Sequence, residues 1–162
     1  MYHLTDFQKG YLAAMIDGEG CIYMTKIGNK QCKLGYSYRI GVDICNTNKS
    51  IIDYIHSFAG GNIALMHRAE GERRKPLYRL RFNTTETKPL LEEIAPYLRG
   101  KQKQALHMVS YINIFNGRTI YPEELHDAVA DLKDKFRERM TKLNAKWSLT
   151  TPAAPLVGIQ MG

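Results

Sequence analysis

The sequence is poor in cysteine and contains no long apolar segment. Its 162 residues include three cysteines, Cys21, Cys32 and Cys45, and no two of them are spaced as a CxxC pair. This number and spacing argue against a disulfide framework or a zinc site and favour a reducing, intracellular environment. The apolar runs are far shorter than the roughly 18 residues that a membrane helix needs, so no membrane association is expected. The first ten residues lack a basic region followed by an apolar stretch, so no signal peptide is expected.

Acidic residues are too few to balance the basic ones, which gives a net charge of +7. Residues 21–45 contribute +3 and residues 61–83 contribute +4, whereas residues 122–147 hold six acids and six bases. A positive excess confined to two segments favours a polyanionic partner such as a nucleic acid. A role in solubility alone is the alternative interpretation of this charge.

Apolar and polar residues alternate strictly in two segments, 36–45 and 78–83. Such alternation is typical of strands with one buried face. The residues expected to face inward are Tyr36, Tyr38, Ile40, Val42, Ile44, Tyr78, Leu80 and Phe82. The expected partner strands cover residues 21–27 and 62–68, and the basic connecting loops cover 28–35 and 69–76. Each basic segment is therefore predicted to form a β-hairpin.

Helices are predicted between and after these hairpins. Thr5 and Gln8 have the spacing of a capping box, which predicts a helix that ends near Asp17. Asn48 is a candidate cap for a second helix. Further helices are expected over residues 87–97, over 101–115 and after Pro122. Residues 148–162 are uncharged and rich in small residues, which predicts an irregular tail after a single domain spanning residues 1–147.

This order of elements predicts an α+β fold of the type αββαββα(α), with a curved four-stranded antiparallel sheet backed by helices. The opposite face of the sheet would be polar and basic. A curved sheet or two-stranded ribbon of this kind can enter the major groove of DNA, where every base pair presents a distinct pattern of donors and acceptors. The alternatives are that this face is simply hydrated or that another subunit covers it.

A row of small residues precedes an acid at the end of the first predicted helix. Gly10, Ala13, Ala14 and Asp17 lie three and four apart, which predicts a narrow face where two helices can pack closely. If two copies pack through this face about a two-fold axis, their Glu19 carboxylates meet. Paired carboxylates repel each other unless divalent cations lie between them, an arrangement that suits phosphodiester hydrolysis.

Residues 12–20 read LAAMIDGEG and resemble the signature of the LAGLIDADG homing endonucleases. The chain has one such string, which resembles the single-motif, homodimeric branch of that family. Two positions depart from the signature: Ala14 replaces a glycine, and Glu19 replaces an aspartate. The resemblance implies that Glu19 and the Gly18 carbonyl bind Mg²⁺, a site that Mn²⁺ or Ca²⁺ can also occupy.

A second segment, Pro96 to Ala105, resembles the family's connection between its third and fourth helices. By that resemblance, Lys101 lies near the scissile phosphate and stabilises charge or orders solvent. Residues 44–48 resemble the end of the family's second strand, which implies that Asn46, or failing that Asn48, orders catalytic water.

The resemblance implies a homodimer that binds about 20 base pairs of nearly palindromic double-stranded DNA and cuts both strands, leaving short 3′ overhangs. Strand parity places the residues expected to read bases at Tyr23, Thr25, Ser37, Arg39, Asp43, Arg68, Arg79, Arg81 and Asn83. Arg79 and Arg81 suit guanine edges and Asn83 suits adenine. The residues expected to bind phosphates are Lys30, Lys33, Arg73, Arg74 and Lys75. The alternatives are an intron-splicing maturase, which would also bind RNA, a catalytically silent DNA-binding protein, or a basic structural domain.

Overall fold

The computed structural model describes residues 3–32, 34–66, 75–115 and 122–149. Its elements follow the predicted order, with a single 3₁₀ turn at Glu123–Leu125 before the last helix. They are α1 (Asp6–Glu19), β1 (Gly20–Gly28), β2 (Tyr36–Asn46), α2 (Lys49–Ala59), β3 (Asn62–Met66), β4 (Leu77–Phe82), α3 (Thr84–Ile94), α4 (Gln102–Phe115) and α5 (His126–Leu149). The strands form one antiparallel sheet in the order β1-β2-β4-β3. The predicted fold class is confirmed.

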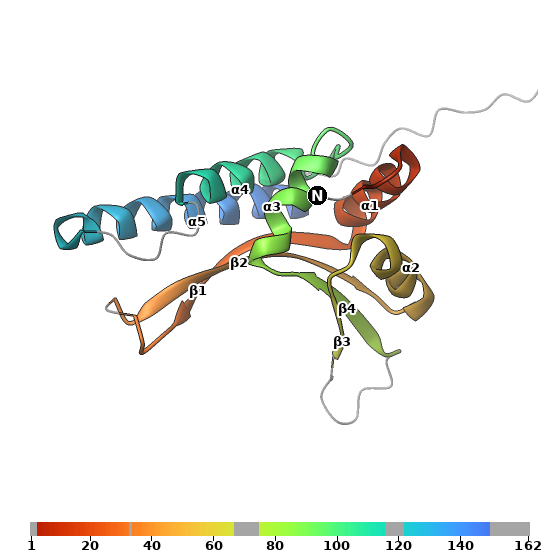
Figure 1. The fold of residues 1–162 in the computed structure, drawn as a ribbon, viewed down its shortest axis with the longest axis horizontal. Coiled ribbons are helices and arrows are strands. Elements are labelled where there is room, and N and C mark those ends of the chain that lie inside the picture. The colour runs from red at the N-terminus through yellow and green to blue at the C-terminus, as the bar shows by residue number, and fades with distance from the viewer. Residues whose placement is uncertain (1–2, 33, 67–74, 116–121, 150–162) are drawn as a thin grey trace, which may run out of the picture.

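The curved sheet has its helices on one side, and no described element covers the other side (Figure 1). The parity predicted for β2 is confirmed, because Ile40, Val42 and Ile44 are at most 4% exposed while Arg39 is exposed on the opposite face. Inward residues of β1, β2 and β4 pack against buried residues of α1, α2, α3 and α4 to form one core. The outer, polar face of the sheet is therefore not covered by any described element and can contact a partner.

One basic residue of the first hairpin lies on the helix side of the sheet. Lys26 forms an ion pair with Asp134 of α5, with 2.9 Å between Nζ and Oδ2. Its ammonium group also lies 3.7 Å from the centre of the Tyr36 ring. Lys26 thus contributes to packing between β1 and α5, and the charge excess of this segment is not all on the outer face.

The beginning of α1 is as predicted, and its end lies two residues beyond the predicted one, with Glu19 at the end of the helix as expected. The Thr5 hydroxyl accepts a hydrogen bond from the Gln8 backbone N–H (3.2 Å), and the Gln8 side chain accepts one from Thr5 (2.9 Å). The helix then continues to Glu19 rather than ending near Asp17. A Cβ atom at Gly20 would lie 2.7 Å from Ile16 Cα, so a glycine is needed where the chain turns directly from α1 into β1.

The start predicted for α3 was wrong, and α5 is longer than expected. Asn83 caps α3, since its side-chain oxygen accepts hydrogen bonds from the backbone N–H groups of Thr85 (3.0 Å) and Glu86 (3.2 Å). The Glu86 carboxylate in turn accepts one from the Asn83 N–H (2.8 Å), which completes a capping box. Asn83 is therefore not part of a strand, and α3 begins three residues earlier than expected. At the other end of the chain, α5 extends to Leu149, so the first two residues of the predicted tail are helical.

None of the helices within the described ranges is both long and apolar enough to span a membrane.

Candidate active site and outer face of the sheet

The end of α1 is fastened to the start of α4 through the side chain of Asp17. Its carboxylate accepts hydrogen bonds from three successive backbone N–H groups, those of Arg99 (2.7 Å), Gly100 (3.0 Å) and Lys101 (2.8 Å). These residues directly precede α4, and the N-terminal end of a helix favours a nearby negative charge. Asp17 thus satisfies these groups from a distant part of the sequence and joins the two helices.

Lys101 completes this junction in the opposite direction. Its ammonium group donates hydrogen bonds to the carbonyl oxygens of Ile16 (2.9 Å) and Asp17 (2.5 Å) in the last turn of α1. A positive charge is favourable there, because the carbonyls at a helix C-terminus carry partial negative charge. The residue is 6% exposed, and burial lowers the pKa of its amine while the negative charge of Asp17 opposes that shift. We refer to the paired contacts of Asp17 and Lys101 as the α1–α4 junction.

Glu19, the predicted catalytic acid, lies two and three residues beyond these carbonyls in the sequence. It is the last residue of α1 and is exposed, as is Gly18 before it. Glu19 has no ion pair with any residue in the described ranges, yet its charge acts on the Lys101 amine and on the Cys45 thiol. The structure therefore brings Glu19 and Lys101 to the same place at the end of α1.

Asn46, the predicted water-ordering residue, is the half-buried last residue of β2. Its side-chain oxygen accepts a hydrogen bond from the Asn48 backbone N–H (2.8 Å). Asn48, the second candidate, caps α2 through its own side-chain oxygen and the N–H of Ser50 (3.0 Å). The side-chain oxygens of both residues thus accept local backbone hydrogen bonds, and the role of Asn46 in ordering water stays a prediction.

One chain offers few ligands for a metal at the end of α1, and those that it offers are oxygen atoms. Within the described ranges, no group of three or more His, Cys, Asp or Glu side chains could hold a metal ion. The Glu19 carboxylate and the Gly18 carbonyl are oxygen donors, which hard cations such as Mg²⁺ and Ca²⁺ prefer. Burial raises the pKa of the nearby Cys21 and Cys45 thiols, and sulfur ligands suit softer metals than these. A second set of oxygen donors is needed to complete a site.

The face predicted for helix pairing is only partly exposed. Ala13 is 1% exposed and belongs to the core of the chain itself, and Asp17 is engaged in the α1–α4 junction. Their part in an interface stays a prediction, and the core side of α1, which includes Ala13, is centred on Leu12 and Ile16. The outward side carries Gly10, Ala14 and Gly18 at intervals of four, with Phe7 70% exposed at its start.

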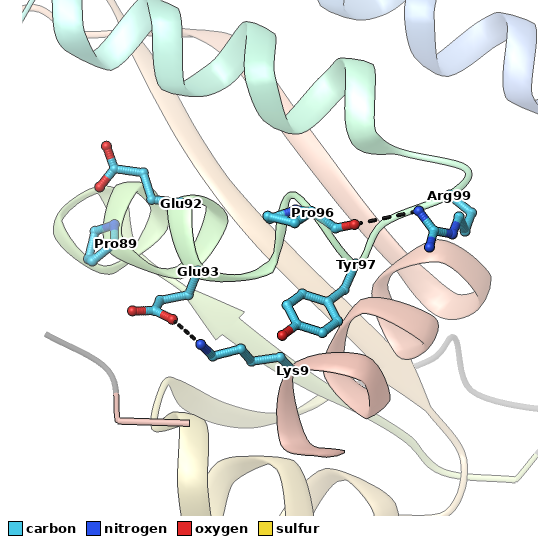
Figure 2. A pocket seen from close by; sticks show the side chains of 7 residues that line it. All are labelled: Lys9, Pro89, Glu92, Glu93, Pro96, Tyr97 and Arg99. Atoms are coloured by element: carbon cyan, nitrogen blue, oxygen red, sulfur yellow. Dashed lines mark hydrogen bonds and ion pairs between the residues drawn. The ribbon is translucent and has the colours of Figure 1, made fainter. Parts of the chain in front are cut away.

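A pocket of about 820 Å³ lies between α1 and α3, along the flank of α1 (Figure 2). Lys9 and Glu93 form an ion pair across it (2.9 Å), and the Arg99 side chain bonds to the Pro96 carbonyl (3.5 Å). Lys9 precedes Glu19 by ten residues, which is about 15 Å along a helix. Neither Glu19 nor Lys101 lines this pocket, although Arg99, which bonds to Asp17, lies at one end of it.

Charged side chains of β2 and β4 form a cluster on the outer face of the sheet. Asp43 lies opposite Arg81 and makes two hydrogen bonds with it, from Nε (2.8 Å) and from Nη2 (2.7 Å). These bonds raise the pKa of the Arg81 guanidinium above its usual value. Arg79 Nε is 3.9 Å from Asp43 Oδ2. Tyr23 of β1 completes the cluster, with its ring centre 5.7 Å from Arg81 Cζ. We call Tyr23, Asp43, Arg79 and Arg81 the outer-face cluster.

Gly41 supports this cluster and was missed as a functional position. It lies opposite Tyr23, and a Cβ atom there would lie 2.6 Å from the Tyr23 hydroxyl oxygen and 2.9 Å from the Phe82 carbonyl oxygen. The signal was present in the sequence, since a glycine inside an alternating strand marks a close approach. The pairing with Tyr23 depends on the register of β1 and β2, which the sequence alone does not determine.

The remaining predicted DNA-binding residues fall into three groups. Thr25 and Arg39 form a cross-strand pair on the outer side of the first hairpin, near Ser37, and Lys30 and Lys75 are exposed next to the strands. Asn83 is exposed, but its side-chain oxygen caps α3. The predicted residues that lie outside the described ranges are Lys33, Arg68, Arg73 and Arg74.

Comparison with known proteins gives a family and a fold. The chain is similar to the homing endonuclease I-CvuI, solved in complex with its target, at 20% identity and a TM-score of 0.67 over 85% of this chain and 82% of that one. It is similar to the archaeal intron-encoded homing endonuclease I-Vdi141I, solved with DNA, at 21% identity and a TM-score of 0.65 over 90% and 99%. It also resembles the LAGLIDADG homing endonuclease I-GzeII, at 17% identity and a TM-score of 0.63 over 93% and 52%.

A direct search of curated protein sequences found no match. The sequence profile of the LAGLIDADG endonucleases, in contrast, matches residues 12–116, which include the second part of α1, the whole sheet and helices α2, α3 and α4. That match begins with the string at residues 12–20 that contains Glu19 and extends past Lys101. The chain belongs to the LAGLIDADG endonuclease family.

Proposed function

We propose that this protein is a site-specific double-strand DNA endonuclease that acts as a homodimer with divalent metal. The observation that carries the proposal is the placement of an exposed Glu19 at the end of α1, directly beyond the buried Lys101, in a chain of this family. The neighbours solved with DNA targets support DNA as the substrate. The face of the sheet that no described element covers (Figure 1) carries Arg39, Arg79 and Arg81, which supports binding in the major groove.

The dimer is proposed to form through Gly10, Ala14 and Gly18 of each α1. Small residues at intervals of four let two helices approach closely, and these three lie on the outward side of α1. A two-fold axis along this side brings the two Glu19 carboxylates together, since both lie at the same end of paired helices. One chain supplies one carboxylate, and the dimer supplies the two that a metal site between the strands of DNA requires.

The Glu19 carboxylates and Gly18 carbonyls of both copies would hold Mg²⁺, with Mn²⁺ or Ca²⁺ as possible substitutes. When bound, the metal polarises the scissile phosphate and activates water. Lys101 holds the end of α1 in place through two carbonyl oxygens, which positions Glu19, and its charge also stabilises the phosphate. Asn46 orders the attacking water, and each strand is cut once to leave short 3′ overhangs.

DNA recognition is assigned to the outer face of the sheet and its loops. Thr25, Ser37 and Arg39 would contact bases together with Tyr23, Arg79 and Arg81 of the outer-face cluster, of which the two arginines are the predicted guanine readers. Arg68 would join them from the second hairpin. Residues assigned to phosphate contacts are Lys30, Lys33, Arg73, Arg74 and Lys75. Binding should accordingly weaken steeply as salt concentration rises.

The test of this function is a selection for cleaved duplexes from a randomised DNA library in magnesium, run in parallel with Glu19→Gln. We expect the wild-type protein to enrich one nearly palindromic site and the variant to bind that site without cutting it. Equal cleavage by the variant would remove Glu19 from the mechanism. Enrichment of bound but uncut DNA by the wild-type protein would identify a DNA-binding protein without nuclease activity.

The dimer is tested separately with Ala14→Leu, which adds bulk to the exposed side of α1. We expect the variant to be a folded monomer by sedimentation and to lose double-strand cleavage, because the helices can no longer approach closely. Ala128→Leu makes the same change at an exposed position of α5 and should leave the dimer intact. A dimer that persists in Ala14→Leu would place the interface elsewhere.

A further inference from the structure

An acidic residue lies in the middle of the surface that is proposed to bind a polyanion. Asp43 is on β2, one of the two central strands of the sheet, and its side chain is 15% exposed. A carboxylate at this position repels DNA phosphates and so lowers affinity for every sequence. Its contribution must therefore be something other than affinity, and its contacts indicate what that contribution is.

The contacts of Asp43 occupy one edge of the Arg81 guanidinium group and leave another edge free. Arg81 has five N–H donors in a fixed plane. Asp43 accepts from Nε and from one hydrogen of Nη2, at 2.8 Å and 2.7 Å. The donors that remain are the two hydrogens of Nη1 and the second hydrogen of Nη2. They form the end of the group, which matches the paired N7 and O6 acceptors of guanine in the major groove.

Tyr23, which packs against Gly41, also restrains Arg81 in this position. The Tyr23 ring centre is 5.7 Å from Arg81 Cζ, within the range of a cation–π contact. Tyr23 itself is held against Gly41, where there is no room for a Cβ atom. Because an arginine side chain otherwise loses much rotational freedom on binding, these contacts reduce the entropy that Arg81 loses when it meets a base.

Arg79, the other arginine of the cluster, is held differently. Its Nε is 3.9 Å from Asp43 Oδ2, too far for a hydrogen bond. That atom is buried and has no hydrogen-bond partner among the residues that the structure describes. Asp43 therefore orients Arg81 through two bonds and attracts Arg79 only by charge. The two arginines are not equivalent readers, although both were predicted to suit guanine.

Building on the proposed endonuclease function, we propose that Asp43 is a specificity-determining positioning residue that holds Arg81 with its free edge directed at a guanine. Asp43 makes no base contact itself in this arrangement. It reduces affinity for DNA in general and raises the difference in affinity between a site with guanine at that position and a site without it. Specificity is such a difference, and a repulsive group can increase it.

The test uses the full-length protein and the duplex that the wild-type protein selects. Each symmetric pair of guanines in that duplex is replaced by adenine in turn, and binding is measured by competition in calcium. The variants are Asp43→Asn and Arg81→Lys. The matched control is Asp131→Asn, the same change of charge in an exposed ion pair of α5.

We expect the wild-type protein to lose affinity roughly tenfold or more at one guanine pair, as a bidentate arginine contact requires. Asp43→Asn and Arg81→Lys should both abolish that loss at the same pair, while Asp43→Asn binds random duplex as tightly as the wild type or more tightly. Asp131→Asn should behave as the wild type. A purely structural role of Asp43 would not move the preference at a single position.

Three results would overturn the proposal in distinguishable ways. If Asp43→Asn keeps every guanine preference, or weakens all duplexes equally, Asp43 does not set specificity. If Arg81→Lys and Asp43→Asn affect different positions, the carboxylate does not act through Arg81. If the wild-type protein selects no duplex at all, the proposed function itself fails, and this inference fails with it.

Discussion

The α1–α4 junction and the outer-face cluster both hold acidic and basic side chains, but they satisfy them with different partners. In the junction, Asp17 bonds to three backbone N–H groups and Lys101 bonds to two backbone carbonyl oxygens. In the cluster, the partners of Asp43 are the side chains of Arg81 and Arg79. The first region depends on the path of the chain and the second on the identity of a few side chains.

This difference separates the two tasks of a site-specific nuclease. The partners of Asp17 and Lys101 are backbone groups, which remain when the side chains of those partner residues are substituted. The junction therefore keeps the end of α1, and Glu19 with it, in one place. Side-chain partners change with each substitution, so the cluster can acquire a new preference without disturbing the fold. Substitutions in the junction should therefore impair cleavage or stability, and substitutions in the cluster should change which DNA is bound.

Lys101→Met tests the junction most severely. We expect cleavage to slow by about a hundredfold to a thousandfold, the usual cost of losing one donor that stabilises charge at a reaction centre. Affinity for the target should change little, because the Lys101 amine faces the carbonyls of α1 rather than the outer face of the sheet. Single-turnover cleavage and binding in calcium measure the two quantities separately.

Lys103→Met is the control, since Lys103 is an exposed neighbour on α4. It should leave the cleavage rate near that of the wild type. A large loss of affinity in Lys101→Met, with the cleavage step intact, would make Lys101 a residue that binds phosphate. In that case the α1–α4 junction would contribute to DNA binding as well as to cleavage.

Asp17→Asn tests the same junction through stability. The change removes the charge that three backbone N–H groups share, and hydrogen bonds to charged groups contribute about 1.5–3 kcal/mol each at most. The amide oxygen can keep part of the contact, so we expect a loss of about 2–3 kcal/mol in the free energy of unfolding, measured in urea. Asp53→Asn breaks an exposed ion pair with Lys49 and should cost less than about 1 kcal/mol. Equal losses in the two variants would mean that Asp17 does not join the helices.

The sequence predicted the features that depend on near neighbours. The capping box of Thr5 and Gln8 and the alternation in β2 use residues two or three apart, and both are confirmed. The start of α3 was missed although Asn83 and Glu86 have the same capping-box spacing. Asn83 also continues the alternation of β4, and by that pattern alone it is expected to be a strand residue rather than a helix cap.

The side of α1 that faces the core could not be predicted, because it is decided by distant contacts. Gly10 lies three residues before Ala13 and four before Ala14, so the helical spacing assigns both alanines to one face. In the structure Ala13 is buried and Ala14 is exposed. Ala13 is buried because α1 packs on the sheet, and Asp17 is engaged because residues 99–101 return to it from more than 80 positions away. The support of Arg81 by Asp43 depends likewise on the β2–β4 register.

Gly41→Ala tests the cluster through the packing of Tyr23. The new methyl group would lie 2.6 Å from the Tyr23 hydroxyl oxygen and 2.9 Å from the Phe82 carbonyl oxygen, so the Tyr23 ring must move and the backbone of β4 must shift slightly. We expect a loss of about 1–2 kcal/mol in unfolding free energy, within the usual cost of overpacking. Once Tyr23 moves, Arg81 is restrained by Asp43 alone, and its guanine preference should weaken only a few-fold, by roughly the size of an exposed cation–π contact.

Gly28→Ala is the matched control, because a Cβ atom at Gly28 meets nothing within 4 Å. Comparing the two variants for affinity at the guanine pair and for cleavage rate distinguishes the cluster from the junction. A change in base preference with an unchanged cleavage rate would show that the two regions act independently. A slower cleavage rate with unchanged preference would mean that the sheet transmits strain from Tyr23 to the end of α1, and the separation of the two tasks would no longer hold.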